Sequence, residues 1–312
     1  MEIEIQPYIG YGYKNRIYCY GRVLKKRTIY KKNNYFFNLI NSYKRIESDE
    51  IPNCEITYTF NGISKKTITN SEGFYLIDDS FSENNNLLNE IITFSVNDVK
   101  SGKIISASGL ILFPDNNAKY AIISDIDDTI LHTNVLSFLK IKVLLNSFFI
   151  SANKRKTIKD TPNWYQQLYA KHNNSFFYIS HSPWNLYDYL LQFIQTHKYP
   201  KGIVLLRDFG KKAKDALQNY STHKKDETEK LINLYPHLQF VLIGDGGEKD
   251  ADIYLELYNK FPNRIKAIFI HRLGNLKHQA RIEELLKGKE TYFYFIKDVN
   301  EALIISKQIG IL

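Results

Sequence analysis

The sequence of 312 residues contains only two cysteines, Cys19 and Cys54, so at most one disulfide bond could form. It also lacks an apolar stretch long enough to span a bilayer, an internal repeat and a low-complexity tract. The first ten residues, MEIEIQPYIG, have neither the basic nor the apolar region of a secretory signal. These absences argue against a disulfide-rich scaffold, a helical membrane protein and a repeat array. We expect a cytoplasmic protein with free thiols.

The composition is that of a folded protein with an excess of positive charge. Hydrophobic residues make up 44% and charged residues 24% of the chain, which is typical of globular rather than disordered sequences, and the length allows about two domains. Lysine and arginine number 42 against 33 acidic residues, giving a net charge of +9. This charge favours anionic partners such as phosphates, nucleic acid or acidic lipid, without choosing among them.

The N-terminal part carries the period-two pattern of β-strands. In residues 54–60 (CEITYTF) apolar and polar residues alternate, and the Asn61-Gly62 pair that follows is a hairpin turn signal. Residues 30–50 lack clear periodicity and are interpreted as a loop or a short helical insertion. We predict an all-β, sandwich-like domain over residues 1–115, with further strand patterns at 16–24, 73–79, 91–98 and 103–113.

Proline, aspartate and asparagine gather in residues 113–120, where we place the domain boundary. After it, short apolar runs alternate with longer helical patterns, which predicts an α/β domain over residues 116–312 with a parallel sheet covered on both faces. Ligands of such sheets bind at the carboxyl ends of the strands. Four of the five apolar runs have a polar residue at that end: Asp125, Ser180, Asp208 and Asp245.

The most informative motif is Asp-Ile-Asp-Asp at residues 125–128, between the apolar segments AIIS and TIL. An acidic cluster is usually a solvated turn, but these flanks predict buried carboxylates, which need a cation or a hydrogen-bonding cage. Asp125 and Asp127 project to the same side of an extended chain. Two such carboxylates repel each other, raise one pKa and recruit a divalent cation, so one can act as nucleophile and the other as acid and base.

Other residues fit phosphoryl transfer in this setting, although each alone has a more ordinary interpretation. Ser180 can donate a hydroxyl to phosphoryl oxygens, and Asp245 is followed by Asp250 five residues on. Lys224 can supply positive charge, just before a helix that we expect to begin near Asp226, which has capping-box spacing with Glu229. Considered alone, Ser180 is more often an ordinary serine at a strand end, Asp245 part of a turn, and Lys224 a surface lysine.

As a set, the D-x-D-x-T motif at 125–129, Ser180, Lys224 and the G-D-x-x-x-x-D motif at 244–250 resemble the four motifs of haloacid dehalogenase superfamily phosphatases. The surrounding segments, from Gln6 to Leu273, resemble the actin-patch-associated phosphatidate phosphatase family. The resemblance implies a Rossmann-like haloacid dehalogenase core with a central parallel sheet. It also implies a Mg2+-dependent hydrolase that converts phosphatidate to diacylglycerol.

The resemblance assigns roles to residues of this sequence. Asp125 matches the nucleophile and Asp127 the general acid and base, whose backbone carbonyl would also face the metal, and Asp128 completes the loop. Lys225 is the alternative candidate for the catalytic lysine. Grouped by role, the catalytic residues are Asp125, Asp127 and Lys224, the substrate-binding residues are Thr129, Ser180 and His181, and the metal ligands are Asp125, Asp127, Asp245 and Asp250.

Two departures from the family pattern bear on substrate preference. His181 stands where an asparagine is expected after the motif serine, and Gly246 and Glu248 stand where serine and glutamine are more frequent. Glu248 adds negative charge near the predicted metal.

Residues 133–163 lie where this superfamily commonly inserts cap elements. The apolar run from Val135 to Ile150 contains two lysines and precedes the basic residues Lys154, Arg155 and Lys156. One interpretation is an interfacial helix on anionic lipid. The alternative is a helix buried on the catalytic core with a solvated basic loop.

Three functions are compatible with the sequence. The first is hydrolysis of phosphatidate, with peripheral contact to a membrane surface. The second is the same chemistry on a soluble phosphoester or a nucleic-acid end, although no stable nucleic-acid complex is expected. The third is a non-catalytic β-sandwich interaction protein, which the intact motif residues argue against.

Overall fold

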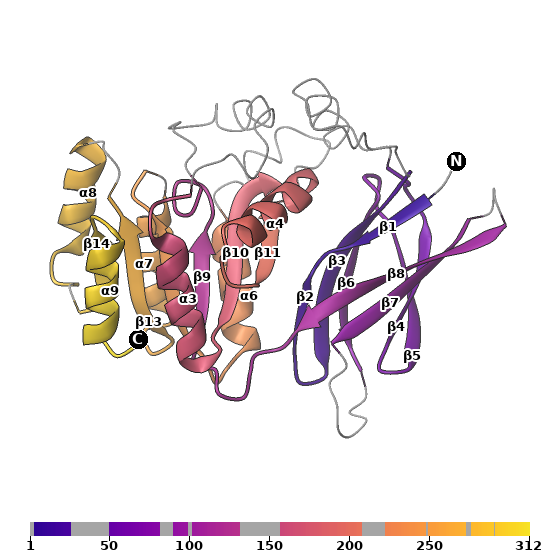
Figure 1. The fold of residues 1–312 in the computed structure, drawn as a ribbon, viewed down its shortest axis with the longest axis horizontal. Helices are drawn as coiled ribbons and strands as arrows, with labels where there is room; N and C mark the ends of the chain where they lie inside the picture. Colours follow the sequence, from indigo (N-terminus) through magenta and orange to yellow (C-terminus); the bar gives the residue numbers. More distant parts are fainter. Residues whose placement is uncertain are drawn as a thin grey trace. The chain divides into compact units, whose positions relative to one another are not determined.

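The computed structural model describes residues 3–25, 50–81, 90–98, 102–131, 157–207, 222–247, 249–272, 276–289 and 291–312 (Figure 1). The chain divides into two compact units, Met1–Pro114 and Asp115–Leu312. We refer to them as the β unit and the α/β unit. Residues 30–49 of the segment 30–50, the basic residues 154–156 and most of the predicted cap insertion at 133–163 lie outside the described residues.

The β unit is a mostly antiparallel sheet in the order β1-β3-β2-β8-β7-β4-β5, with β6 paired to β3. Among the strand pairs that the structure describes in this unit, β2 and β8 are the parallel pair. The hairpin predicted at Asn61-Gly62 is confirmed, because Phe60 pairs with Ile63 across it. Both turn residues have positive φ, 49° and 77°, as a two-residue turn between antiparallel strands requires. The strands are β1 (Ile3–Pro7), β2 (Gly10–Tyr13), β3 (Arg16–Lys25), β4 (Glu55–Phe60), β5 (Ile63–Ile68), β6 (Phe74–Ser80), β7 (Ile91–Asp98) and β8 (Lys103–Leu112).

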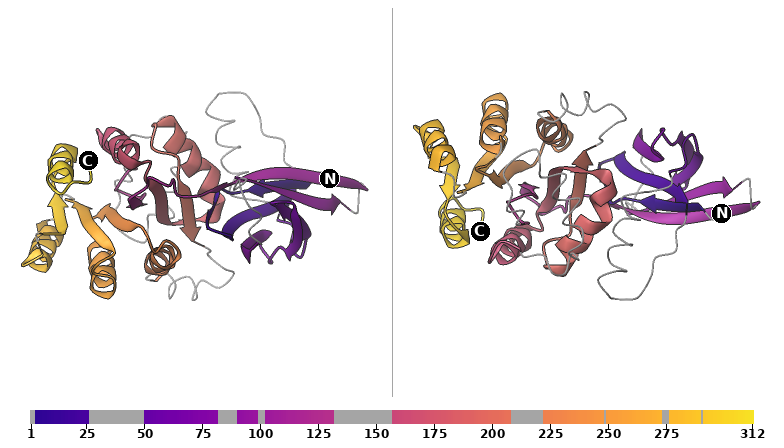
Figure 2. Two further views of the ribbon diagram at one scale, coloured as in Figure 1. Left: turned by 90° about the horizontal axis from the view of Figure 1, so that it is seen from below. Right: turned by 90° about the horizontal axis from the view of Figure 1, so that it is seen from above.

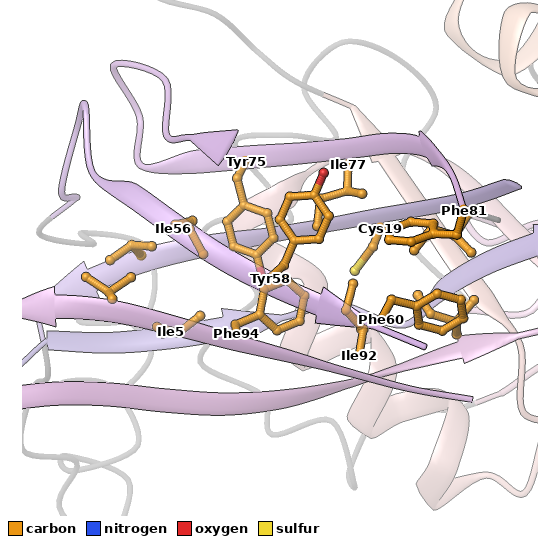
Figure 3. Packing of buried hydrophobic residues seen from close by; sticks show 14 residues of the cluster. Ile5, Cys19, Ile56, Tyr58, Phe60, Tyr75, Ile77, Phe81, Ile92 and Phe94 are labelled. Atoms are coloured by element: carbon orange, nitrogen blue, oxygen red, sulfur yellow. The ribbon is translucent and has the colours of Figure 1, made fainter. Parts of the chain in front are cut away.

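Strand alternation builds the apolar core of the β unit. Ile56, Tyr58 and Phe60 of β4 face inward, and Ile92 and Phe94 of the neighbouring β7 do the same (Figure 3). The intervening residues of both strands point outward, as a side-chain period of two dictates. Cys19 is buried in this core and Cys54 is partly buried, and both thiols are free, as expected from the sequence.

The α/β unit contains a parallel sheet with the strand order β11-β10-β9-β12-β13-β14. Numbered along the chain, this order is 3-2-1-4-5-6, that of doubly wound sheets, and it reverses between β9 and β12. The predicted mixed architecture is confirmed at this level. The strands are β9 (Tyr120–Asp125), β10 (Ser175–Pro183), β11 (Ile203–Arg207), β12 (Gln239–Asp245), β13 (Ile265–His271) and β14 (Phe293–Ile296).

Helices cover both faces of this sheet (Figure 2). Helices α6 and α7 contact each other, and α3 contacts α9. The helices are α3 (Thr161–His172), α4 (Tyr187–Thr196), α6 (His223–Leu234), α7 (Asp250–Lys260), α8 (Leu276–Leu286) and α9 (Val299–Gln308), with a short 3-10 helix η2 (Trp184–Leu186). Every residue of β9 and β11 is buried, which explains the apolar runs at 120–123 and 203–206 that precede their polar ends. None of the helices in the described ranges has the length and apolarity needed to cross a bilayer.

Candidate active site

Three of the four polar residues predicted at the strand ends, Asp125, Ser180 and Asp245, lie at the carboxyl-terminal end of the parallel sheet, and the fourth, Asp208, lies outside the described residues. Strand β9 ends at Asp125, which pairs with Ile179 of β10, and β12 on its other side ends at Asp245. Ser180 follows Ile179 on β10. The strand order reverses between β9 and β12, the position where ligands of doubly wound sheets bind.

Asp125 lies at the centre of the site and is 1% exposed. Lys224 Nζ donates to its Oδ1 at 2.9 Å, and Thr129 Oγ1 donates to its Oδ2 at 3.1 Å. Burial raises the pKa of Asp125 well above its ordinary value, the charge of Lys224 opposes this, and the neighbouring aspartates add to it. Thr129 and Lys224 therefore each hold one oxygen of the central carboxylate.

The backbone turns sharply after Asp125, and this turn explains how acidic residues can stand between apolar segments in the sequence. Asp128 adopts a left-handed conformation with φ of 56°, and the amides of Ile130 and Leu131 donate to the carbonyl of Ile126 at 3.0 Å. The three apolar side chains are completely buried. They anchor the loop in the core, and the carboxylates occupy the sheet edge.

Asp127 faces strand β10. Ser180 Oγ donates to its Oδ2 at 2.8 Å, and Ser182 Oγ lies 3.5 Å from the same oxygen. The backbone amide of Ser182 also donates to Ser180 Oγ at 2.9 Å. Ser182 is absent from the residues predicted from the sequence, although its position two residues after Ser180 on a strand puts both side chains on one face.

Asp245 and Asp250 lie on the other side of Asp125. Asp245 Oδ1 accepts from the amide of Gly247 at 2.6 Å, and its own amide donates to Asp250 Oδ2 at 3.3 Å. This contact requires Gly244, because a Cβ there would lie 2.4 Å from Asp250 Oδ2. The G-D-x-x-x-x-D spacing thus brings the first turn of α7 against the end of β12.

Lys224 is completely buried and bridges two of the carboxylates. Its Nζ forms an ion pair with Asp250 as well as with Asp125. Lys225 instead pairs with Glu256 on a more exposed surface. The predicted helix start at Asp226 is wrong, because α6 begins at His223 and Lys224 lies within its first turn. The Asp226 amide donates to the Thr222 carbonyl, so the helix is already formed where capping-box spacing suggested its start.

Three carboxylates lie close enough together to hold a cation. One oxygen from each of Asp125, Asp245 and Asp250 lies within 4.8 Å of the others, and all three residues are buried. Carboxylate oxygens are the ligands that hard divalent cations prefer. Asp127 is not part of this group of side chains, and its metal contact through the backbone carbonyl stays a prediction.

The remaining predicted residues lie near these groups or outside the described ranges. His181 is partly buried, and its ring centroid lies 6.2 Å from that of His223. Glu248 lies outside the described residues. Behind the central carboxylate, Ser124 Oγ donates to the carbonyl of Asp125 at 2.7 Å and hydrogen-bonds the hydroxyl of Tyr165 at 2.8 Å, a support that the sequence pattern did not indicate.

Comparison with known proteins identifies relatives of this domain. Residues 120–272 match the family model described as "Phosphatidate phosphatase APP1, catalytic domain". The chain is 32% identical over 155 residues to phosphatidate phosphatase APP1 of Saccharomyces cerevisiae, covering 49% of this chain and 26% of that protein. It is 30% identical over 223 residues to an uncharacterized protein of Schizosaccharomyces pombe, covering 68% of this chain and 36% of that protein. The chain thus spans only 26% and 36% of the length of these curated relatives.

Among solved structures, a carbohydrate acetylesterase from Xanthomonas citri aligns with 83% of this chain and 65% of its own, at 8% identity and a TM-score of 0.25. That likeness is too low to bear on fold or function. The sequence matches instead coincide with the part of the chain that carries the buried aspartates and Lys224, and they confirm the resemblance predicted from the motifs. Residues 120–272 are therefore similar in sequence to the catalytic domain of phosphatidate phosphatase APP1.

Proposed function

We propose that the α/β unit is a Mg2+-dependent phosphatase that hydrolyses phosphatidate to diacylglycerol through an aspartyl-phosphate intermediate. The observation that carries the chemistry is the buried Asp125 carboxylate, held by Lys224 and Thr129 beside Asp127 at the end of a parallel sheet. The choice of phosphatidate is supported by the name of the Saccharomyces cerevisiae relative. We also propose a haloacid dehalogenase-like core for this unit, supported by its strand order and motif positions.

In the first step, an oxygen of Asp125 attacks phosphorus, and the bond from phosphorus to the leaving oxygen of the substrate breaks. Asp127 enters this step protonated and gives its proton to that oxygen, so diacylglycerol leaves as a neutral alcohol. Lys224 places positive charge beside the attacking carboxylate and the phosphoryl oxygens.

In the second step, Asp127 takes a proton from water as the water oxygen bonds to phosphorus. The bond between phosphorus and Asp125 breaks, which releases phosphate and restores both carboxyl groups to their starting states. The hydroxyls of Ser180 and Ser182 orient the Asp127 carboxylate before substrate binds, and that of Ser182 can keep this contact during both transfers. Ser180 and Thr129 are the proposed phosphoryl-binding hydroxyls.

Asp125, Asp245 and Asp250 would hold the metal, because they present three buried carboxylate oxygens within 4.8 Å of one another. When bound, Mg2+ supplies positive charge next to the phosphoryl oxygens. We further propose that the catalytic domain begins near residue 116, that residues 133–163 form its cap, and that the protein acts in the cytoplasm at membrane surfaces.

Phosphate release from dispersed phosphatidate and from a panel of soluble phosphoesters, with Mg2+ and with excess chelator, tests the proposal. We expect turnover of phosphatidate with Mg2+ and none in chelator. Full activity in chelator would contradict the metal assignment. Turnover of soluble phosphoesters alone would favour the alternative substrate class.

The intermediate has its own test. A phosphoryl adduct should accumulate in Asp127→Asn, which retains the nucleophile but loses the group that activates water. It should be absent from Asp125→Asn. An adduct that persists in Asp125→Asn would place the nucleophile elsewhere.

A further inference from the structure

Two tyrosine hydroxyls reach the two ends of the segment Asp125–Leu131, which we call the aspartate loop. At its first end, Ser124 Oγ donates to the Asp125 carbonyl at 2.7 Å and lies 2.8 Å from the hydroxyl of Tyr165 on α3. A serine hydroxyl has one proton. Because Ser124 gives that proton to the carbonyl, Tyr165 must be the donor in its bond to Ser124.

At the other end of the aspartate loop, three donors surround the Ile130 carbonyl. The hydroxyls of Thr157 and Tyr199 lie 3.2 and 3.3 Å from it, and the amide of Ile158 donates to it at 3.3 Å. The hydroxyls of Thr157 and Tyr199 are also hydrogen-bonded to each other, so one can donate to the other while the second donates to the carbonyl. Thr157 pairs in addition with Leu131 as an isolated antiparallel bridge. The chain that returns at Thr157 is therefore bonded to the end of the aspartate loop.

The two tyrosines also contact each other. Their rings meet edge to face, with centroids 5.5 Å apart and an interplanar angle of 75°. Ser124 and Tyr165 are completely buried and Tyr199 is 4% exposed, so water competes little for their hydroxyls. The aspartate loop is thus hydrogen-bonded at both ends to side chains that are themselves fixed by packing.

The position of these bonds connects them to the reaction. Asp125 forms the first end of the aspartate loop, and Asp127 lies between the two ends. The Asp128 amide donates to the Leu131 carbonyl at 2.9 Å, which closes the loop on itself. A rotation of either end would therefore turn the carboxylates, and a misplacement of about 1 Å can lower a rate about 10²-fold.

We propose that Tyr165 and Tyr199 are positioning residues, which act through Ser124 and Thr157 to fix the aspartate loop in the orientation that the reaction needs. This inference rests on the proposed function, because Asp125 and Asp127 carry the chemical steps there. The hydroxyls carry the role, since they make the bonds that reach the loop, whereas the rings fill the core.

The first test removes the hydroxyl at the Asp125 end. Tyr165→Phe keeps the ring, and it should lower kcat about tenfold on both dioctanoyl phosphatidate and p-nitrophenyl phosphate, measured on the full chain with Mg2+. KM should change by less than about twofold, because the loss concerns the transition state rather than ground-state binding. Ser124→Ala should act in the same direction. The double variant should lose no more than the larger single loss, since both changes break one connection.

The second test uses a matched pair of variants at the Ile130 end. Thr157→Val keeps the branched shape and removes the hydroxyl, whereas Thr157→Ser keeps the hydroxyl. The valine variant should lower kcat at least about threefold, and the serine variant should stay within about twofold of wild type, because the bond to the Ile130 carbonyl is retained. Tyr199→Phe should resemble the valine variant.

The control for the loss of a tyrosine hydroxyl is Tyr294→Phe. The Tyr294 hydroxyl donates to the Thr291 carbonyl at 2.7 Å, and its strand β14 is separated from β9 by β12 and β13. This variant should leave kcat unchanged. Circular dichroism and a urea unfolding curve check that each variant is folded under the assay conditions.

Unchanged kcat in folded Tyr165→Phe or in folded Thr157→Val would overturn the positioning role and leave the proposed function intact. Equal losses in the two Thr157 variants, or a similar loss in Tyr294→Phe, would overturn it as well. A wild type that hydrolyses neither substrate with Mg2+ would overturn the proposed function, and the positioning role with it.

Discussion

The β unit buries almost only apolar side chains, whereas the α/β unit buries several aspartates and a lysine at one end of its sheet. In the described part of the β unit, Arg22 and Asp98 are the charged residues below one-tenth exposure. Arg22 lies on the phenyl ring of Phe74 and pairs with Glu50. The α/β unit places Asp125, Asp127, Asp245, Asp250 and Lys224 within one site.

Desolvating charged groups costs free energy, whereas burying apolar side chains is favourable. The interiors of the two units therefore contribute differently to stability. In the β unit, close packing contributes stability. In the α/β unit, holding like charges close together at the proposed active site costs stability. Substitutions should therefore separate into those that affect activity and those that affect folding, according to the unit that carries them.

The sharpest test of this contrast is Asp125→Asn. It should lower kcat by roughly 10³-fold or more, because the amide cannot attack phosphorus. It should leave the free energy of unfolding unchanged or higher, because it removes a buried negative charge from among three others. Phosphate release and urea unfolding measure the two effects, with the exposed Asp252→Asn of α7 as control. If the variant retained a tenth of the wild-type activity, Asp125 would not be the nucleophile.

Lys224→Met should lower both the phosphatase activity and the free energy of unfolding. It leaves Asp125 and Asp250 buried without their shared cation, and breaking a buried ion pair from one side costs about 3–5 kcal/mol. Lys225→Met, which removes an exposed pair with Glu256, should change the free energy of unfolding far less. Urea unfolding of both variants measures the difference. Similar small losses in the two would mean that the buried pairs are solvated in the folded protein.

Phe94→Ala should affect only stability. Phe94 is 1% exposed in the β-unit core and packs against the ring of Tyr75, and removing such a side chain costs about 3 kcal/mol. The kcat of folded protein should not change. Thr93→Ala, one residue away on the exposed face of β7, is the control for denaturant unfolding. A drop in kcat without denaturant would show that the β-unit core acts on the chemistry.

Asp79→Asn should have the smallest effect, about 1 kcal/mol, because the Asp79 carboxylate is partly solvated. Burial tends to raise the pKa of Asp79, but hydrogen bonds from Lys65 and Tyr58 outweigh it, so the folded pKa lies below the unfolded one. The stabilisation is therefore present above about pH 4 and is lost as pH falls through the lower folded pKa. Unfolding curves of wild type and variant should converge in acid. A constant difference from pH 7 to pH 2 would contradict this assignment.

The strand-forming segments and the hairpin were predictable because their signals are local. Residues 54–60 alternate with a period of two, and Asn61-Gly62 supplies the positive φ values that the turn needs. The short strand β14 and helix α9 were not predicted, although Phe293–Ile296 is an aromatic and apolar run and Asp298 caps α9 by accepting from the amide of Glu301. The start of α6 was misplaced because capping-box spacing at Asp226 is compatible with a position already inside the helix.

The sequence by itself determined which strands end in polar residues and that Asp125 stands between apolar segments, because strand periodicity and burial preference act over a few neighbouring residues. Only the tertiary structure decided which polar groups meet. It brought Lys224, rather than Lys225, to Asp125 across 99 residues of chain, Ser182 to Asp127, and Tyr165 to Ser124. These contacts depend on strand order and on how α6 packs over β10, which are set by the burial of whole apolar faces rather than by any local motif.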